Sequence, residues 1–233
     1  MVPAPRPWTV LPHEKFEKLE PNLWCVQADL HRWSQVQRRM FIGRLSDGRL
    51  AFMNAIPLEE PFMRELEEWG TPSFLLVPSG MHRLDIHAWR ERYPRMQLLT
   101  AASFHEKVQK VAPVDGGWEL FPKDPRVRLT ELRGARGEIA VRSGGTLCFP
   151  GDLLMNQPHL GGVEGFVFRL LGSTGGPRIT RIARLFVVDD RETLREELNK
   201  LAAEPGIERI VPCHGQIIRL DIKGVLRRAA ASL

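Results

Sequence analysis

The 233-residue sequence has no apolar run close to the roughly 18 residues that a membrane-spanning helix needs. Its first twenty residues carry prolines and charges where a secretory signal peptide would have an apolar core. These two absences argue against membrane insertion and against export. We therefore expect a cytoplasmic protein.

Cysteine is also scarce. Cys25, Cys148 and Cys213 are too few and too widely separated to form a disulfide framework or a thiolate zinc site. Each of them lies among apolar neighbours, so we expect three buried free thiols.

A concentrated basic patch is missing too, although the formal net charge is +5. The arginines are scattered, and their densest groups, at 37–39 and 226–228, have no interleaved aromatic residues. Nucleic-acid-binding surfaces usually gather basic residues on one face or along one helix. The pattern favours solvated arginines over a nucleic-acid partner.

What the sequence does contain is an ordered succession of strand and helix patterns. A hairpin is indicated at 39–55, and the strongest helix pattern is 189–206, where Asp190 is a candidate N-cap. Residues 1–20 read as an arm with little structure, and the Gly-rich stretch 156–180 is not assigned. Further strands are expected at 22–28, 73–78, 96–100, 126–132, 137–143, 146–150 and 207–212, and further helices at 58–70, 86–93, 101–111 and 216–233.

This order predicts a mixed α/β (α+β) protein. Two sheets with helices outside both would bury every apolar face, which gives a four-layer αββα sandwich. No linker separates the two halves, so we expect residues 21–233 to form a single domain after the arm.

Candidate metal ligands follow three of the predicted strands. Ligand sites in mixed α/β proteins usually lie where strands end and loops begin. Imidazole and carboxylate groups are ligands that zinc, iron and manganese accept. The strand at 73–78 is followed by His82, Asp85 and His87, the strand at 146–150 by Asp152, and the strand at 207–212 by His214.

Each of these residues also has a structural interpretation. Asp85 fits the N-cap of the helix at 86–93, and a loop histidine is often a surface residue. His159 is either an additional ligand or a surface residue. Cys213 beside His214 suggests a nucleophile and its base, but adjacent residues in an extended segment point to opposite sides.

The order His, Asp, His, with the flanking sequences "PGDLL" and "PCHG", resembles the metallo-β-lactamase fold superfamily from about residue 20 to the end. Within that superfamily, "VPSGMH", "PGDLLMN" and "VPCHG" look closest to a branch defined as a domain of unknown function. The resemblance implies the αββα sandwich and one or two metal ions, often zinc, that activate water for hydrolysis.

The resemblance also implies a reduced metal site. The family loop reads His-x-His-x-Asp-His, and on "HRLDIH" only His82 and His87 match, at its first and last positions. The positions that differ from the family are held by Leu84, Ile86, Ala135 and Asn54.

One divalent metal would then be held by His87, Asp152 and His214, with His82 nearby as a further ligand. Zinc is expected first, and iron, manganese or a metal-free protein are the alternatives.

The function implied is that of a metal-dependent hydrolase using metal-activated water, with His82 and Asp152 as catalytic residues and a small molecule as substrate. The alternative is a non-catalytic binding protein, a metal-free pseudoenzyme on the same fold. A nuclease is a third reading, which the scattered charge disfavours.

The loop at 28–39 is expected to flank the site. There Arg32, Trp33, Arg38 and Arg39 would hold an anionic or aromatic substrate, unless this is an exposed loop with one packed tryptophan. The sequence gives neither the substrate nor the oligomeric state.

Overall fold

The computed structural model describes residues 6–31 and 34–233. One of its sheets has six strands in the spatial order β1-β2-β3-β4-β5-β6. The pairs from β1 to β4 are antiparallel, whereas β4, β5 and β6 run parallel. The strands are β1 (Glu17–Glu20), β2 (Leu23–Asp29), β3 (Gln37–Arg44), β4 (Arg49–Met53), β5 (Thr71–Val77) and β6 (Gln97–Thr100).

The other sheet has four strands in the order β10-β9-β8-β7. β9 and β10 are parallel neighbours, although about sixty residues separate them in the chain. Their carboxyl ends therefore lie side by side at one edge of the sandwich. The strands are β7 (Arg128–Glu131), β8 (Ile139–Ser143), β9 (Thr146–Phe149) and β10 (Arg209–Pro212).

Alternating side chains of this sheet enter two different cores, because successive residues of a strand point to opposite faces. Val141 and Cys148 belong to the core shared with the six-stranded sheet. Leu147 and Phe149 belong to a second core shared with the C-terminal helices. Both faces of the sheet are covered, so β9 is buried along its whole length.

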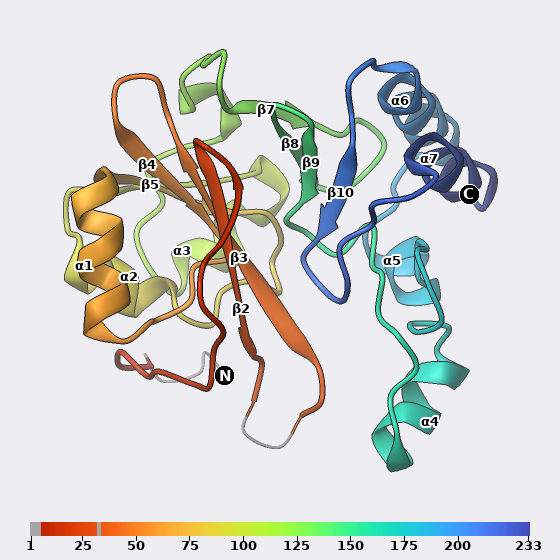
Figure 1. Ribbon diagram of the computed structural model, residues 1–233, viewed down its shortest axis with the longest axis horizontal. Coiled ribbons are helices and arrows are strands. Elements are labelled where there is room, and N and C mark those ends of the chain that lie inside the picture. The colour runs from red at the N-terminus through yellow and green to blue at the C-terminus, as the bar shows by residue number, and fades with distance from the viewer. Residues whose placement is uncertain (1–5, 32–33) are drawn as a thin grey trace.

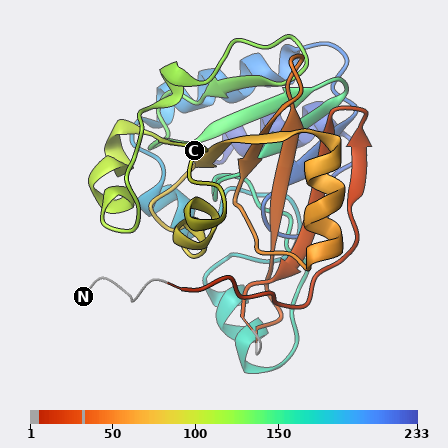
Figure 2. The ribbon, with the colours of Figure 1, turned by 90° about the vertical axis from the view of Figure 1, so that its left-hand side faces the viewer.

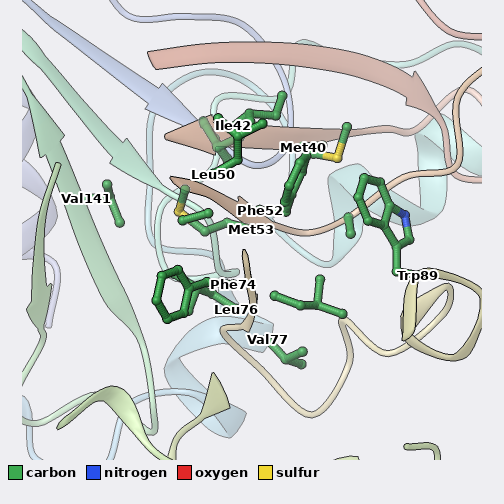
Figure 3. Close-up of a cluster of buried hydrophobic side chains, with 14 of the residues drawn as sticks. Met40, Ile42, Leu50, Phe52, Met53, Phe74, Leu76, Val77, Trp89 and Val141 are labelled. Atoms are coloured by element: carbon green, nitrogen blue, oxygen red, sulfur yellow. The ribbon is translucent and has the colours of Figure 1, made fainter. Parts of the chain in front are cut away.

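The largest buried cluster lies on both faces of the six-stranded sheet and is built from large apolar side chains of β3, β4 and β5. Figure 3 shows Phe52 and Trp89 lying together on one side and Val141 on the side of Met53. Both aromatic side chains are fully buried, and their ring centroids are 4.6 Å apart.

Helices cover both outer faces, as the sequence predicts, and Figure 1 shows α1 to α3 on one side and α6 and α7 on the other. Asp190 caps α6 as expected, because its carboxylate accepts hydrogen bonds from the backbone of Glu192 and Thr193. The helices are α1 (Glu60–Trp69), α2 (Ile86–Arg92), α3 (His105–Gln109), α6 (Arg191–Ala203) and α7 (Ile222–Ala231), with short 3₁₀ turns at Ala102–Phe104 and Trp118–Leu120.

The stretch that the sequence left unassigned contains α4 (Gly162–Leu170), and α5 (Arg181–Phe186) follows it. We call residues 156–187 the α4–α5 segment. Figures 1 and 2 both show α4 beyond the ends of the strands. Glu164 of α4 accepts hydrogen bonds from the Ser34 hydroxyl and the Gln35 backbone, which joins the segment to the loop between β2 and β3.

The N-terminal arm is shorter than residues 1–20. β1 lies inside that range and pairs with β2, because a partner edge is available there. Before it, Trp8 packs against Trp89 at 5.4 Å between ring centroids. Among the described residues, no helix is both long and apolar enough to cross a bilayer.

Candidate metal centre

Three loops meet at one rim of the sandwich. His82 lies on the loop after β5 of the first sheet. Asp152 follows β9, and Cys213 and His214 follow β10, both in the second sheet. Because the two sheets face each other, loops that are distant in sequence come together where these strands end.

The structure brings His82, Asp152 and His214 together. His82 Nε2 lies 3.2 Å from an oxygen of Asp152, and His214 Nε2 lies 3.5 Å from Oδ1 of the same carboxylate. The side chains of His82 and His214 are each 12% exposed, and that of Asp152 is 20% exposed. The carboxylate therefore lies within reach of both imidazoles.

His87, the other histidine expected here, is not brought into this group. It lies on α2, where Ile86 and Trp89 are buried and set the inward face of the helix. That phase turns position 87 outward, so the His87 side chain is 41% exposed and its Nδ1 lies 4.0 Å from Glu91. The family motif places its histidines by spacing along a loop, whereas here a helix has already begun at Ile86.

Asp85 does not cap that helix. It occupies the N-cap position, but its side chain makes no capping hydrogen bond. Its fully buried carboxylate forms an ion pair with Arg38 of β3 and lies 3.7 Å from Arg6. Asp85 therefore neutralises an arginine beneath the site.

The electrostatics of the group are dominated by Asp152. Burial would lower the pKa of His82, but the charge and hydrogen bond of Asp152 outweigh it and raise that pKa to about 9. Burial would raise the pKa of Asp152, yet the two imidazoles hold it well below its usual range. Without a bound cation, a proton shared between carboxylate and imidazole stabilises the group.

A backbone contact orients His214. Its Nδ1 lies 2.7 Å from the carbonyl oxygen of Gln37, the first residue of β3. A carbonyl only accepts, so Nδ1–H donates and Nε2 is the nitrogen that faces Asp152. This arrangement, with the outer nitrogen on a carbonyl, is the usual one for a metal-binding histidine.

Cys213 joins the group, contrary to the expectation that its side chain would point away from His214. The chain leaves the extended conformation after Pro212 and bends at residues 213 and 214, so both side chains turn to the same side. Ligand atoms of His82, Cys213 and His214 lie within 4.8 Å of one another. Burial would raise the pKa of Cys213, but the His214 charge lowers it to about 7.

Asn54 ties the three strand ends together at the position where the family has an acidic residue. It has a left-handed φ of 57°. Its Nδ2 donates to the carbonyl of Pro150 at 2.6 Å and to Cys213 Sγ at 2.8 Å. An amide can donate in this way and a carboxylate cannot. The buried Asn54 side chain therefore holds the ends of β9 and β10 against the end of β4.

Glu138 is a second residue of the site that no sequence motif indicates. It is fully buried, and its Oε1 accepts a hydrogen bond from the Asp152 backbone at 3.0 Å. Its Oε2 has no partner within the described ranges. Burial, and then the charge of Asp152, raise the pKa of Glu138 to about 8. Only the glycine at 151 lets this carboxyl come so close, because a Cβ there would lie 2.0 Å from Oε2.

A cavity of about 360 Å³ opens onto the group. His82, Asp152, Cys213 and His214 lie on its wall with apolar side chains such as Leu84. Arg38 also lines it, although its guanidinium is paired with Asp85. This size is typical of a small-molecule site.

One of the expected substrate-binding residues, Arg39, does not line the cavity. Arg39 is buried and donates to the backbone carbonyls of Pro212 and Gly215, which fixes the loop after β10. Arg32 and Trp33 lie outside the described residues. His159 hydrogen-bonds Thr174 through Nδ1 at 3.0 Å and does not line this cavity.

The donors present suit a zinc-type cation. The group contains two imidazoles, a carboxylate and a thiol whose pKa is lowered. Zinc accepts nitrogen, oxygen and sulfur ligands of these kinds. His82 Nδ1 is buried and has no hydrogen-bond partner among residues 6–31 and 34–233, so no protein contact fixes that ring from its far side. The residues therefore fit such an ion in ligand type and in mutual distance.

Comparison with solved structures identifies the architecture. DIM-1 metallo-β-lactamase exposed to ceftazidime aligns with a TM-score of 0.61 at 12% identity, over 96% of this chain and 99% of that one. A metallo-β-lactamase from Pontibacter korlensis aligns with a TM-score of 0.61 at 12% identity, over 94% and 99%. This chain has the metallo-β-lactamase fold. FIM-1 from Pseudomonas aeruginosa, solved in a mono-zinc form, aligns with a TM-score of 0.57 at 14% identity, over 96% of each chain.

The metallo-β-lactamase fold confirms the predicted αββα sandwich. No protein-family model and no curated protein matches the sequence. At sequence identities of 12–14%, these structures are similar to this chain in fold only. Three positions at which the sequence departs from the family motif hold apolar side chains. Leu84 lines the cavity, and Ile86 and Ala135 are buried.

Proposed function

We propose that this chain is a metal-dependent hydrolase that binds one divalent ion between His82, Asp152 and His214, with Cys213 within reach. The observation that carries the proposal is the convergence of these side chains from three strand ends onto the wall of one cavity. Clusters of groups with displaced pKa values in a cleft are typical of functional sites.

Zinc is the first candidate ion, and iron or manganese are alternatives. When bound, such an ion supplies Lewis-acid polarisation and activates water for attack on a substrate. The chain's own residues prepare the position. Gln37 fixes the orientation of His214, and Glu138 fixes the backbone of Asp152.

Asp152 is the residue on which this proposal depends most. It lies within hydrogen-bond reach of His82 and close to His214, and its pKa is held well below its usual range, so it stays ionised and available to bind a cation together with either ring. Protons on these imidazoles must leave before the nitrogens can bind a cation. The deprotonated nitrogens of His82 and His214 would then bind the ion beside Asp152.

Metal analysis of purified protein tests the proposal. We expect about one equivalent of ion after reloading in the wild type, and loss of that ion in Asp152→Ala and His214→Ala, measured by elemental mass spectrometry. His87→Ala is the matched control, because His87 is a nearby histidine whose side chain turns away from the cavity. A wild type that binds no ion after reloading, or a His87→Ala variant that loses it, would contradict the proposal.

The second candidate is a metal-free binding protein on the same fold. It is favoured by the close approach of Asp152 to both imidazoles, which can satisfy the carboxylate without a cation. Under this alternative, chelator treatment would leave the melting temperature unchanged. A bound ion stabilises the folded state by mass action, so the hydrolase hypothesis predicts a fall in melting temperature.

A further inference from the structure

A second cavity lies beside the first and reaches the same polar group. Its volume is about 480 Å³. Asp152 and His214 line both cavities, together with Leu30 and Met81. A molecule that reaches Asp152 and His214 could therefore extend into either space.

The walls of this second cavity are mainly apolar away from Asp152 and His214. The lining includes Phe168 of α4, and Ile182 and Phe186 of α5. Leu30 and Val36, on the loop between β2 and β3, also line it. Thr180 also lines it, but its hydroxyl oxygen is engaged by the backbone of Ala183 at the start of α5. Gln157 and Ser173 add two more polar side chains, but most of the lining is hydrocarbon, and Asp152 and His214 are the polar residues that the cavity shares with the candidate metal centre.

Exposed apolar side chains extend this surface beyond the cavity. Eight of the eleven large hydrophobic side chains exposed among the described residues belong to the α4–α5 segment. A ninth, Met81, is 82% exposed and also lines the cavity. Apolar side chains gathered in this way mark sites of binding. The eight are Val163, Phe166, Val167, Leu170, Leu171, Ile182, Leu185 and Phe186.

We propose that the second cavity takes the hydrocarbon chain of an acyl ester whose carbonyl group lies at Asp152 and His214. This inference rests on the proposed hydrolase function for its chemical step and on the cavity alone for its binding step. A single hydrocarbon chain with a polar carbonyl end matches a mainly apolar space that also contacts Asp152 and His214.

The reaction would be ester hydrolysis. The oxygen of water forms a bond to the acyl carbonyl carbon, and the bond from that carbon to the alcohol oxygen breaks. The proton released by water goes to the departing alcohol oxygen, so the products are a carboxylic acid and an alcohol.

Chain length is the variable that tests the inference. Burial of one methylene strengthens binding by at most roughly fourfold. We expect decanoate to displace a fluorescent fatty-acid probe at a concentration at least about tenfold lower than butanoate. The same order is expected in kcat/KM for the p-nitrophenyl esters of these acids.

Two matched variants locate the chain. Ile182→Trp places an indole at the cavity wall, whereas Leu185→Trp places one on the same helix outside the cavity. Both side chains are exposed, so neither substitution disturbs the core. We expect the preference for decanoate to disappear in Ile182→Trp and to persist in Leu185→Trp, with melting temperatures confirming that both fold.

The binding and activity measurements separate the two proposals. Chain-dependent binding that is sensitive to Ile182→Trp, without hydrolysis of any ester, would overturn the hydrolase function and support the chain site. Equal binding of butanoate and decanoate, or binding unaffected by Ile182→Trp, would overturn the chain site even if esters are hydrolysed. Asp152→Ala should lose hydrolysis and retain probe binding.

Discussion

The sandwich body and the α4–α5 segment use the same kinds of apolar side chain in opposite ways. In β4 and β5, Phe52, Phe74 and Leu76 are buried between layers. In α4, Phe166 and Leu170 are more than 60% exposed. Buried apolar area stabilises a fold, whereas exposed apolar area does not. The difference indicates that the body holds the fold together, and it is consistent with the binding role that we propose for the segment.

The largest expected effect comes from the body. Phe52→Ala removes a fully buried ring that packs against Trp89 and leaves a cavity in a closely packed part of the core. We expect the free energy of unfolding to fall by about 3–5 kcal/mol, measured by chemical denaturation. A loss below about 1 kcal/mol would contradict the view that this layer is closely packed.

A smaller effect is expected where the body borders the candidate metal centre. The pKa of Glu138 is raised from 4.5 to about 8 in the folded protein, so the folded state holds a proton that the unfolded state has lost. The associated stability is complete below about 4.5 and disappears as the pH rises through 8. Glu138→Gln cannot titrate and keeps an oxygen that can accept from the Asp152 backbone.

We therefore expect the stability of metal-free Glu138→Gln to improve relative to the wild type as the pH rises across that window. Denaturation of both proteins at several pH values measures the difference. Parallel curves would show that Glu138 is already ionised in the folded protein.

The smallest effect is expected in the segment. Phe166→Ser changes a side chain that is 63% exposed and lies outside the second cavity. We expect the free energy of unfolding to change by no more than about 0.5 kcal/mol in the same denaturation measurement. A loss comparable to that of Phe52→Ala would mean that this side chain is covered in solution, and the contrast between the two regions would fail.

Much of the architecture could be predicted because it depends on local pattern. The nearly continuous burial of β8 and the complete burial of β9 follow from both faces of their sheet being covered. Placing His82, Asp152 and His214 together needed only the rule that loops after strands share a rim. The sandwich supplies that rim, so these three residues do lie together.

The remaining features depend on geometry that spacing does not encode. His87 turns outward because α2 begins at Ile86 and its phase is set by Trp89. Cys213 turns inward because the chain bends after β10. Glu138 can lie near Asp152 only because Gly151 has no side chain to collide with its carboxyl group. Many apolar residues of the α4–α5 segment are exposed. Its helices therefore lack the regular spacing of buried apolar residues from which a helix is predicted.

The contact made by Glu164 has a mechanical consequence. The Glu164 carboxylate on α4 accepts hydrogen bonds from both Ser34 and Gln35, and the Gln35 side chain also hydrogen-bonds the backbone of Gly161, so several contacts join the start of α4 to the β2–β3 loop. Leu30 and Val36 lie on that loop, and Phe168 lies one turn along from Glu164. These hydrogen bonds therefore connect the helix that carries Phe168 to the loop that carries Leu30 and Val36, so residues lining the second cavity from both elements are held by the same contacts.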